Sequence, residues 1–252
     1  MSLSPPPEID LADLTGGHRP SVQDADLCLR NTARLLTDAA VCGPEGRLML
    51  TELAIEEAAK GILIHWRMDI QDQLGSAEDA PERYVQLKPE VKSLLAKYGT
   101  VLGDRALQES FSKHRVKLQH LRFLAEVFGE ELRGGSFEPW RPARPYTDPT
   151  VQRLAELGEI PEIGRRGRAE LTELVSSLAE LVGPGSPDQS LDRIRLRATY
   201  VDWDDSGEGC TYPRVDPTMS LKLSKVAGFL ARTLAMSSVI HRDHIQGRRV
   251  AR

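Results

Sequence analysis

The sequence contains few of the features that identify the common classes of enzyme. It has no phosphate-binding P-loop, no cofactor-binding loop and no nucleophile elbow. Aromatic residues make up only 5% of the 252 residues, so the core must consist mainly of Leu, Ala, Val and Ile. Stretches that alternate apolar and polar residues are scarce, which argues against a sheet. We therefore expect an all-α protein that uses no cofactor.

Cysteines and long apolar runs are also rare. Cys28, Cys42 and Cys210 show no metal-ligand spacing and are odd in number, which favours reduced thiols. The first residues have neither the basic nor the apolar region of a signal peptide. No run of about 18 uncharged apolar residues occurs. The sequence thus predicts a cytoplasmic protein without a membrane partner.

The charge of the chain is slightly negative overall, at −4, which excludes a global basic field for binding nucleic acid. Basic residues gather at residues 225–252 instead, where six Lys and Arg residues stand against Asp243. We interpret this segment as a solvated C-terminal tail. Whether its arginines touch RNA is left open by the sequence.

Proline, glycine and apolar spacing divide the chain into three parts. We predict a flexible arm at 1–20, a helical bundle core at 21–133 that carries the candidate site, and, at 134–252, further helices and an extended segment packed on that core. Helices are predicted at 21–41, 44–73, 88–98, 104–132, 168–182, 188–198 and 217–246, with a loop at 74–89 and an extended segment with a turn at 206–207.

The predicted helix 44–73 carries charges in an otherwise apolar stretch, LTELAIEEAAKGILIHW. Its apolar residues surround the helix axis, so some of the four charges must be buried or must line a groove. An unpaired buried charge costs several kcal/mol, so partners from other helices are required. An antiparallel arrangement could bring Arg30, Glu56 and His114 together. Such an ionic centre can be structural or catalytic, and both remain open. The four charged residues are Glu52, Glu56, Glu57 and Lys60.

Four blocks of the sequence resemble the AbiV family of bacterial abortive-infection proteins, over residues 20–205. The blocks are RNTARLL, LMLTELAIEEAAKGIL, FSKHRVKL and LRATYVDWDD. The family pattern has an Asn-Ala pair, for which this chain has Asn31 followed by Thr32. The remaining matched positions are Glu56, Glu57, Lys60, His114, Lys117, Tyr200, Val201 and Asp202.

The resemblance implies a role in defence against bacteriophage, in which the infected cell arrests its own translation or growth. It also implies a phage-encoded protein as activator. AbiV proteins are similar to the wider HEPN group of all-α domains, many of which are ribonucleases that act as dimers. The HEPN signature places an arginine four to six residues before a histidine, and Arg115 and His120 have this spacing.

The expected chemistry is metal-free cleavage of RNA, in which a histidine transfers a proton and a cation stabilises the phosphorane. The expected catalytic residues are His114, Lys117, Arg115, His120 and Glu56, with Arg30, Asn31, Glu57, Lys60, Tyr200 and Asp202 in supporting positions. The alternative to this toxin-like enzyme is a binding protein that senses a phage product and blocks translation by contact, without catalysis.

A metal site is a weaker interpretation. Glu52, Glu56, Glu57 and His114 could ligate a divalent ion, but bundle metal sites usually use Glu-x-x-His motifs, and this sequence has none. His241 and His244 are three residues apart near the basic end of the chain. We expect them to be surface residues rather than ligands, and we expect no metal.

Overall fold

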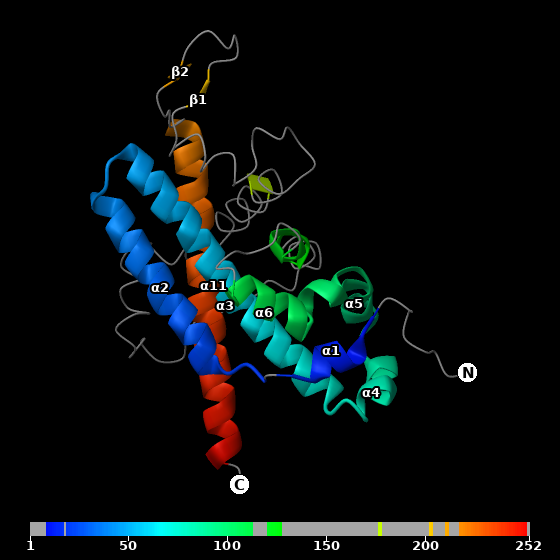
Figure 1. Cartoon of the computed structure of the whole chain (residues 1–252). Helices are drawn as coiled ribbons and strands as arrows, with labels where there is room; N and C mark the ends of the chain where they lie inside the picture. The colour runs from blue at the N-terminus through cyan, green and yellow to red at the C-terminus, as the bar shows by residue number, and fades with distance from the viewer. Residues whose placement is uncertain are drawn as a thin grey trace.

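The structure is a computed structural model that describes residues 9–17, 19–112, 120–127, 176–177, 202–203, 210–211 and 217–250. These residues are predominantly helical, which confirms the prediction of an all-α fold (Figure 1). The helices are α1 Leu11–Thr15, α2 Val22–Val41, α3 Pro44–Leu74, α4 Ala80–Gln86, α5 Pro89–Leu102, α6 Asp104–Ser112 and α11 Pro217–Val250, and residues 120–127 are also helical. None of the helices in these ranges combines the length and apolarity that crossing a bilayer requires.

The helices α2 and α3 begin at the signals that the sequence contains. Ser21 caps α2, accepting a hydrogen bond from the Asp24 backbone while the Asp24 carboxylate accepts one from the Ser21 backbone. Pro44 occupies the first turn of α3, where its missing N–H costs no hydrogen bond. Gly75 ends α3 with a φ of 74°, a conformation that glycine adopts without strain.

The helices α2, α3 and α11 form the centre of the molecule (Figure 1). Helix α3 packs against both of the others, which also contact each other. The helices α2 and α3 form an antiparallel hairpin, whereas α11 runs parallel to α3. The parallel register is visible in the contact of Ser238 with His65 and, one turn later, of His241 with Asp69. Every residue from 58 to 65 of α3 is buried, so other parts of the molecule cover this helix on all sides.

Close packing of the three helices depends on Gly61. A Cβ atom added there would lie 2.6 Å from the Leu234 side chain on α11 and 3.1 Å from Cys28 Cβ on α2. Replacing Gly61 by alanine should therefore lower the free energy of unfolding by about 1–2 kcal/mol, because overpacking outweighs the better helix propensity of alanine.

The matched control is Gly228 in α11, where an added Cβ would have only Arg232 Nη1 nearby, at 3.9 Å. Alanine at this position should raise the free energy of unfolding by up to about 1 kcal/mol, because propensity acts there without a clash. Urea unfolding of both variants checks the pair. Equal shifts at the two sites would show that propensity, not the three-helix contact, sets the effect.

The prediction of a flexible arm at residues 1–20 is wrong for residues 9–17. Asp10 caps the short helix α1, and Ile9, Leu11 and Leu14 are buried in the main core. The sequence signal was misleading because the Pro- and Gly-rich composition around this helix is typical of loose segments. Three apolar residues within six positions were enough to dock it.

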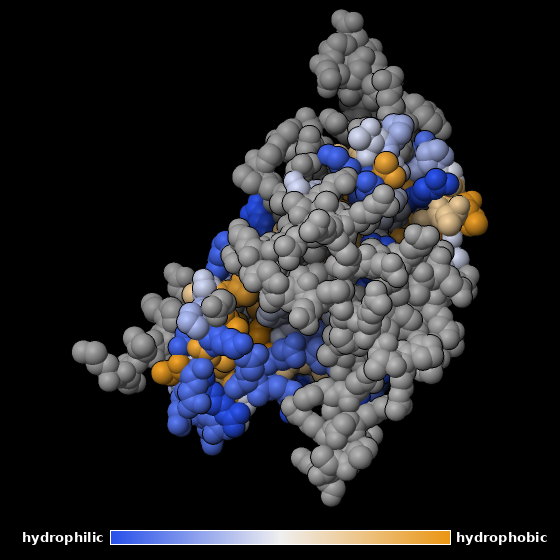
Figure 2. Space-filling view, turned by 180° about the vertical axis from the view of Figure 1, so that it is seen from behind, coloured by the Kyte–Doolittle hydropathy of each residue, from blue (hydrophilic) through white to orange (hydrophobic). Residues whose placement is uncertain are grey.

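The segment between α3 and α5 is also more helical than predicted. Residues 80–86 form α4 where a loop was expected, because Pro81 stands in the first turn of the helix and does not break it. Ala80 and Tyr84 pack inward, while hydrophilic residues gather over this end of the molecule (Figure 2). Helix α5 continues past Gly99, where termination was predicted, because Val101 and Leu102 are buried in the core.

The second half of the predicted core differs from expectation in its boundaries. The predicted helix 104–132 is found as α6 and as helical residues 120–127, and its other residues lie outside the described ranges. Helix α11 belongs to the central bundle, so the core is not confined to residues 21–133. The predicted helices at 168–182 and 188–198 fall almost wholly outside the described residues.

The predicted extended segment contains two short strands, β1 Asp202–Trp203 and β2 Cys210–Thr211. They pair antiparallel, with Asp202 opposite Thr211 and Trp203 opposite Cys210. The two strands flank residues 206–207 in the sequence, where a turn was predicted. Residues 206–207 lie outside the described residues.

Candidate functional site

Three of the four charges predicted in the middle of α3 are buried. Glu52, Glu56 and Lys60 follow one another at intervals of four residues, so they lie along one side of the helix. Their exposed fractions are 1%, 5% and 3%, respectively. This confirms that the charges of this stretch do not point into bulk solvent. A buried row of this kind is the feature of the chain that most needs an explanation.

Lys60 forms an ion pair within α3, and its charge also acts on Cys28 of the neighbouring helix α2. Its Nζ donates a hydrogen bond to the partly exposed Glu57 carboxylate, one turn earlier. The Cys28 thiol on α2 lies in the field of both residues. Burial raises the pKa of Cys28 to about 12, and the negative charge of Glu57 adds to this effect. Cys28 is therefore a neutral thiol and not a nucleophile at neutral pH.

The helical residues 120–127 pack against α3 at Trp66. Phe123 contacts Trp66 edge-on, with ring centroids 5.4 Å apart, and it contacts Tyr98 of α5 at the same distance. On an ideal helix Trp66 projects about 40° from Glu52 but about 80° from Glu56 and about 120° from Lys60, so this contact does not place residues 120–127 over the acidic row. The predicted partners His114, Arg115 and Lys117 precede this stretch in the chain and lie outside the described residues.

His120 has a different place from the one predicted. Its side chain is fully buried, with Nε2 2.8 Å from the Val101 carbonyl oxygen and Nδ1 3.4 Å from Ser110 Oγ. It therefore joins residues 120–127 to the ends of α5 and α6. A histidine sealed in this way cannot reach a phosphodiester unless the bundle opens. The prediction of His120 as a catalytic residue therefore has to be corrected: the geometry gives this side chain a structural role.

The supporting residues predicted on α2 do not reach the acidic row. Arg30 is exposed, and Asn31 Oδ1 accepts hydrogen bonds from Arg34 Nε and Nη2 at 3.2 and 2.9 Å. The predicted meeting of Arg30 with Glu56 is wrong, because α2 turns its small and apolar residues toward α3. Of the last predicted pair, Tyr200 lies outside the described residues, and Asp202 is placed as the first residue of β1.

A histidine pair, which sequence analysis missed, joins α3 to α11. The rings of His65 and His241 stack with centroids 4.3 Å apart and an interplanar angle of 26°. His65 is 2% exposed, and its Nε2 lies 3.0 Å from Ser238 Oγ. His241 was expected at the surface, and this expectation is wrong for its ring. The sequence could have suggested this pair only if the parallel contact of α3 and α11, and the alignment of the two helices, had been known.

The two imidazoles of this pair carry different charges. Nδ1 of His241 is 2.8 Å from the Ser237 carbonyl oxygen and its Nε2 is 3.0 Å from Asp69 Oδ1. Because both neighbours accept hydrogen bonds, both ring nitrogens of His241 must carry protons. Burial acts to lower the pKa of His241, but the bonds to Asp69 and Ser237 outweigh it, so the pKa is raised.

His65 is held in the neutral form. Burial, together with the positive charges of His241 and Arg242, lowers the pKa of His65 to about 3. Its Nδ1 has no hydrogen-bond partner among the described residues. The stacked pair therefore holds one positive charge at neutral pH, located on the ring that faces Asp69.

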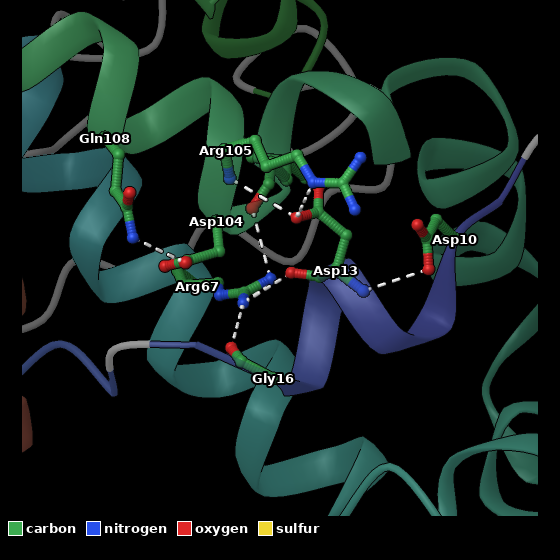
Figure 3. Close-up of polar contacts among 8 residues, drawn as sticks. Asp10, Asp13, Gly16, Arg67, Asp104, Arg105 and Gln108 are labelled. Atoms are coloured by element: carbon green, nitrogen blue, oxygen red, sulfur yellow. Dashed lines mark hydrogen bonds and ion pairs between the residues drawn. The ribbon is translucent and has the colours of Figure 1, made fainter.

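Arg67 forms a second buried centre on α3 (Figure 3), about two turns of helix after Lys60. Its guanidinium donates to the carbonyl oxygens of Asp13, Gly16 and Leu102 at 2.7, 3.2 and 3.3 Å. Burial lowers the pKa of Arg67, and the nearby Asp104 and Asp13 carboxylates oppose this effect. The side chain thus ties the C-terminal ends of α1 and α5 to α3, which is a structural role.

Within the described ranges, no group of three or more His, Cys, Asp or Glu side chains is arranged to hold a metal ion. Comparison of the chain with protein-family models, with curated proteins and with solved structures finds no match. The candidate site must therefore be judged on its own residues, and the strongest of these are the buried charges of α3.

Proposed function

We propose that the protein is a bacterial antiphage protein of the abortive-infection type, which arrests translation or growth of the infected cell. The observation that carries the proposal is the burial of Glu52, Glu56 and Lys60 in the central helix of an all-α bundle. These residues belong to the block that resembles the AbiV pattern most fully. A buried charged row costs stability compared with apolar packing, so its presence is best explained by a requirement of fold or function.

The first mechanism that would serve this function is metal-free cleavage of RNA in the cytoplasm by a HEPN-type homodimer. His114 would transfer the proton, with Lys117 or Arg115 as the cation at the phosphorane. Glu56 would then act through these side chains rather than on RNA directly, because it is 5% exposed. A phage-encoded protein would switch the activity on.

The second mechanism is arrest by contact, in which the protein binds a phage product and then the translation machinery without cleaving RNA. A specific observation favours it over the first: His120, the histidine of the HEPN spacing, is sealed inside the bundle and bonded to Val101. The site would then be the surface above the buried row, and the row would fix the register of the helices.

Phage challenge of cells that express single variants separates the two mechanisms. The variants are His114→Ala, Lys117→Ala and Glu56→Gln, with Arg34→Ala on the exposed face of α2 as the matched control. The nuclease predicts discrete RNA fragments after infection that vanish in the His114 variant while the purified protein keeps its helical content. Arrest by contact predicts intact RNA throughout. Absence of any protection by the unmodified chain, with all phages tested, would refute the proposed function itself.

A further inference from the structure

Among the described side chains, two charged contacts in consecutive positions attach the C-terminal half of α11 to the rest of the bundle. His241 bonds to Asp69 on α3, and Arg242 Nη2 donates to Asp26 Oδ1 on α2 at 2.8 Å. Beyond these contacts α11 continues to Val250 and extends past the N-terminal end of α2 (Figure 1). These two contacts therefore mark the point at which the last turns of α11 are held to the bundle.

The stacked histidines at this point can accept one more proton only at the cost of the contact. His241 already carries two N–H groups, so the next proton must go to His65. Two stacked imidazolium rings, 4.3 Å apart and mostly buried, would repel each other. The positive Arg242 lies close enough to add to that repulsion.

The other charged groups around the pair do not cancel it. From α3 the pair faces Asp69 and Asp72, and from α2 Asp26 lies nearby. Asp69 is already bonded to His241, Asp26 to Arg242, and Asp72 to Arg19. Each of the three carboxylates thus has a cationic partner before His65 takes up a proton, so none stands ready to stabilise a second imidazolium.

We propose that the His65–His241 pair is a proton-sensitive lock, which holds the last turns of α11 on α3 with one proton and releases them when it gains a second. Release needs a pH below neutrality, since His65 is forced to stay neutral while stacked but titrates as an ordinary histidine once freed. The lock is independent of the proposed function.

Hydrogen exchange of the full chain tests the lock, read by mass spectrometry at pH 7.0 and pH 5.0 and corrected for the intrinsic pH dependence of exchange. Protection of residues 237–250 should fall by roughly tenfold or more at pH 5.0 and should lie below that of α2 and the first half of α3, which exchange only when the whole bundle unfolds. Equal protection of all three helices at pH 5.0 would overturn the proposal, because it would report global unfolding instead of local release.

Two variants sharpen the result. His65→Phe keeps a stacked ring without a titrating group, so protection of residues 237–250 should be the same at both pH values. Asp69→Ala removes the acceptor of His241, so protection of this segment should be low already at pH 7.0, and this result does not depend on whether the first variant folds. A wild-type pH response in His65→Phe, or full protection at pH 7.0 in Asp69→Ala, would contradict the lock.

Discussion

Replacing Arg67 by methionine should lower the free energy of unfolding by about 3–5 kcal/mol. Methionine fills a similar volume but donates no hydrogen bond, so the carbonyl groups of Asp13, Gly16 and Leu102 lose their buried donor. These carbonyls lie at the ends of α1 and α5, where helices leave acceptors without intrahelical partners. We expect both helices to detach from α3 in the same step.

Urea unfolding followed by circular dichroism measures this loss. Arg34→Met is the matched control, since Arg34 makes exposed contacts with Asn31 and Asp38 on α2, and it should change stability by less than about 1 kcal/mol. Arg67→Lys keeps the charge without the planar fork and should fall between the two. A loss below 1 kcal/mol for Arg67→Met would mean that α1 and α5 are held by apolar packing alone.

Acidification should destabilise the protein through His65. The pKa of His65 is about 3 in the folded chain and about 6.5 in an unfolded one, so the unfolded state binds the extra proton first. Stability is therefore lost as the pH falls below 6.5, and the loss continues toward pH 3. Two pH units below 6.5, the contribution amounts to about 3 kcal/mol at 1.36 kcal/mol per unit.

His241 contributes with the opposite sign. Its pKa is raised by folding, so its stabilisation is fully present below pH 6.5 and is lost as the pH rises through its folded pKa. Between pH 6.5 and 4.5 this contribution is constant. The part of the acid-side slope that disappears in His65→Phe can therefore be assigned to His65 in that window.

Urea midpoints measured at pH 8.0, 6.5, 5.5 and 4.5 for the native chain and for His65→Phe isolate the effect. The native chain should lose stability steadily below pH 6.5, while the variant should lose markedly less over the same range. Ser224→Ala, on an exposed part of α11, serves as the control and should follow the native chain. Parallel curves for the native chain and His65→Phe would mean that His65 is not held neutral by folding.

The polar residues of α3 have different roles along the helix. Arg67 binds carbonyls that end other helices, and His65 joins α11, so both residues organise the fold. Glu52, Glu56 and Lys60 lie further toward the N-terminus of α3, whereas Phe123 contacts Trp66, the neighbour of Arg67. If the protein has a functional centre on α3, it is this N-terminal half rather than the half that carries Arg67.

The sequence by itself determined the main helices and the presence of buried charge. The Ser21 cap, Pro44, and the apolar spacing of 21–41 and 44–73 predicted α2 and α3 to within one residue at each end, because these signals act within a few residues of chain. The burial of Glu56 and Lys60 also followed locally, since their neighbours on every side of the helix are apolar.

Only the tertiary structure decided which charged residues meet. Arg30 and Arg67 are both arginines within predicted helices, yet Arg30 is exposed and Arg67 is fully buried. His241 was expected at the surface and instead stacks on His65, which lies 176 positions earlier in the chain. The register between helices distant in sequence is set by side-chain packing, at Gly61, Cys28 and Leu234, and no local pattern in one helix encodes the position of its partner.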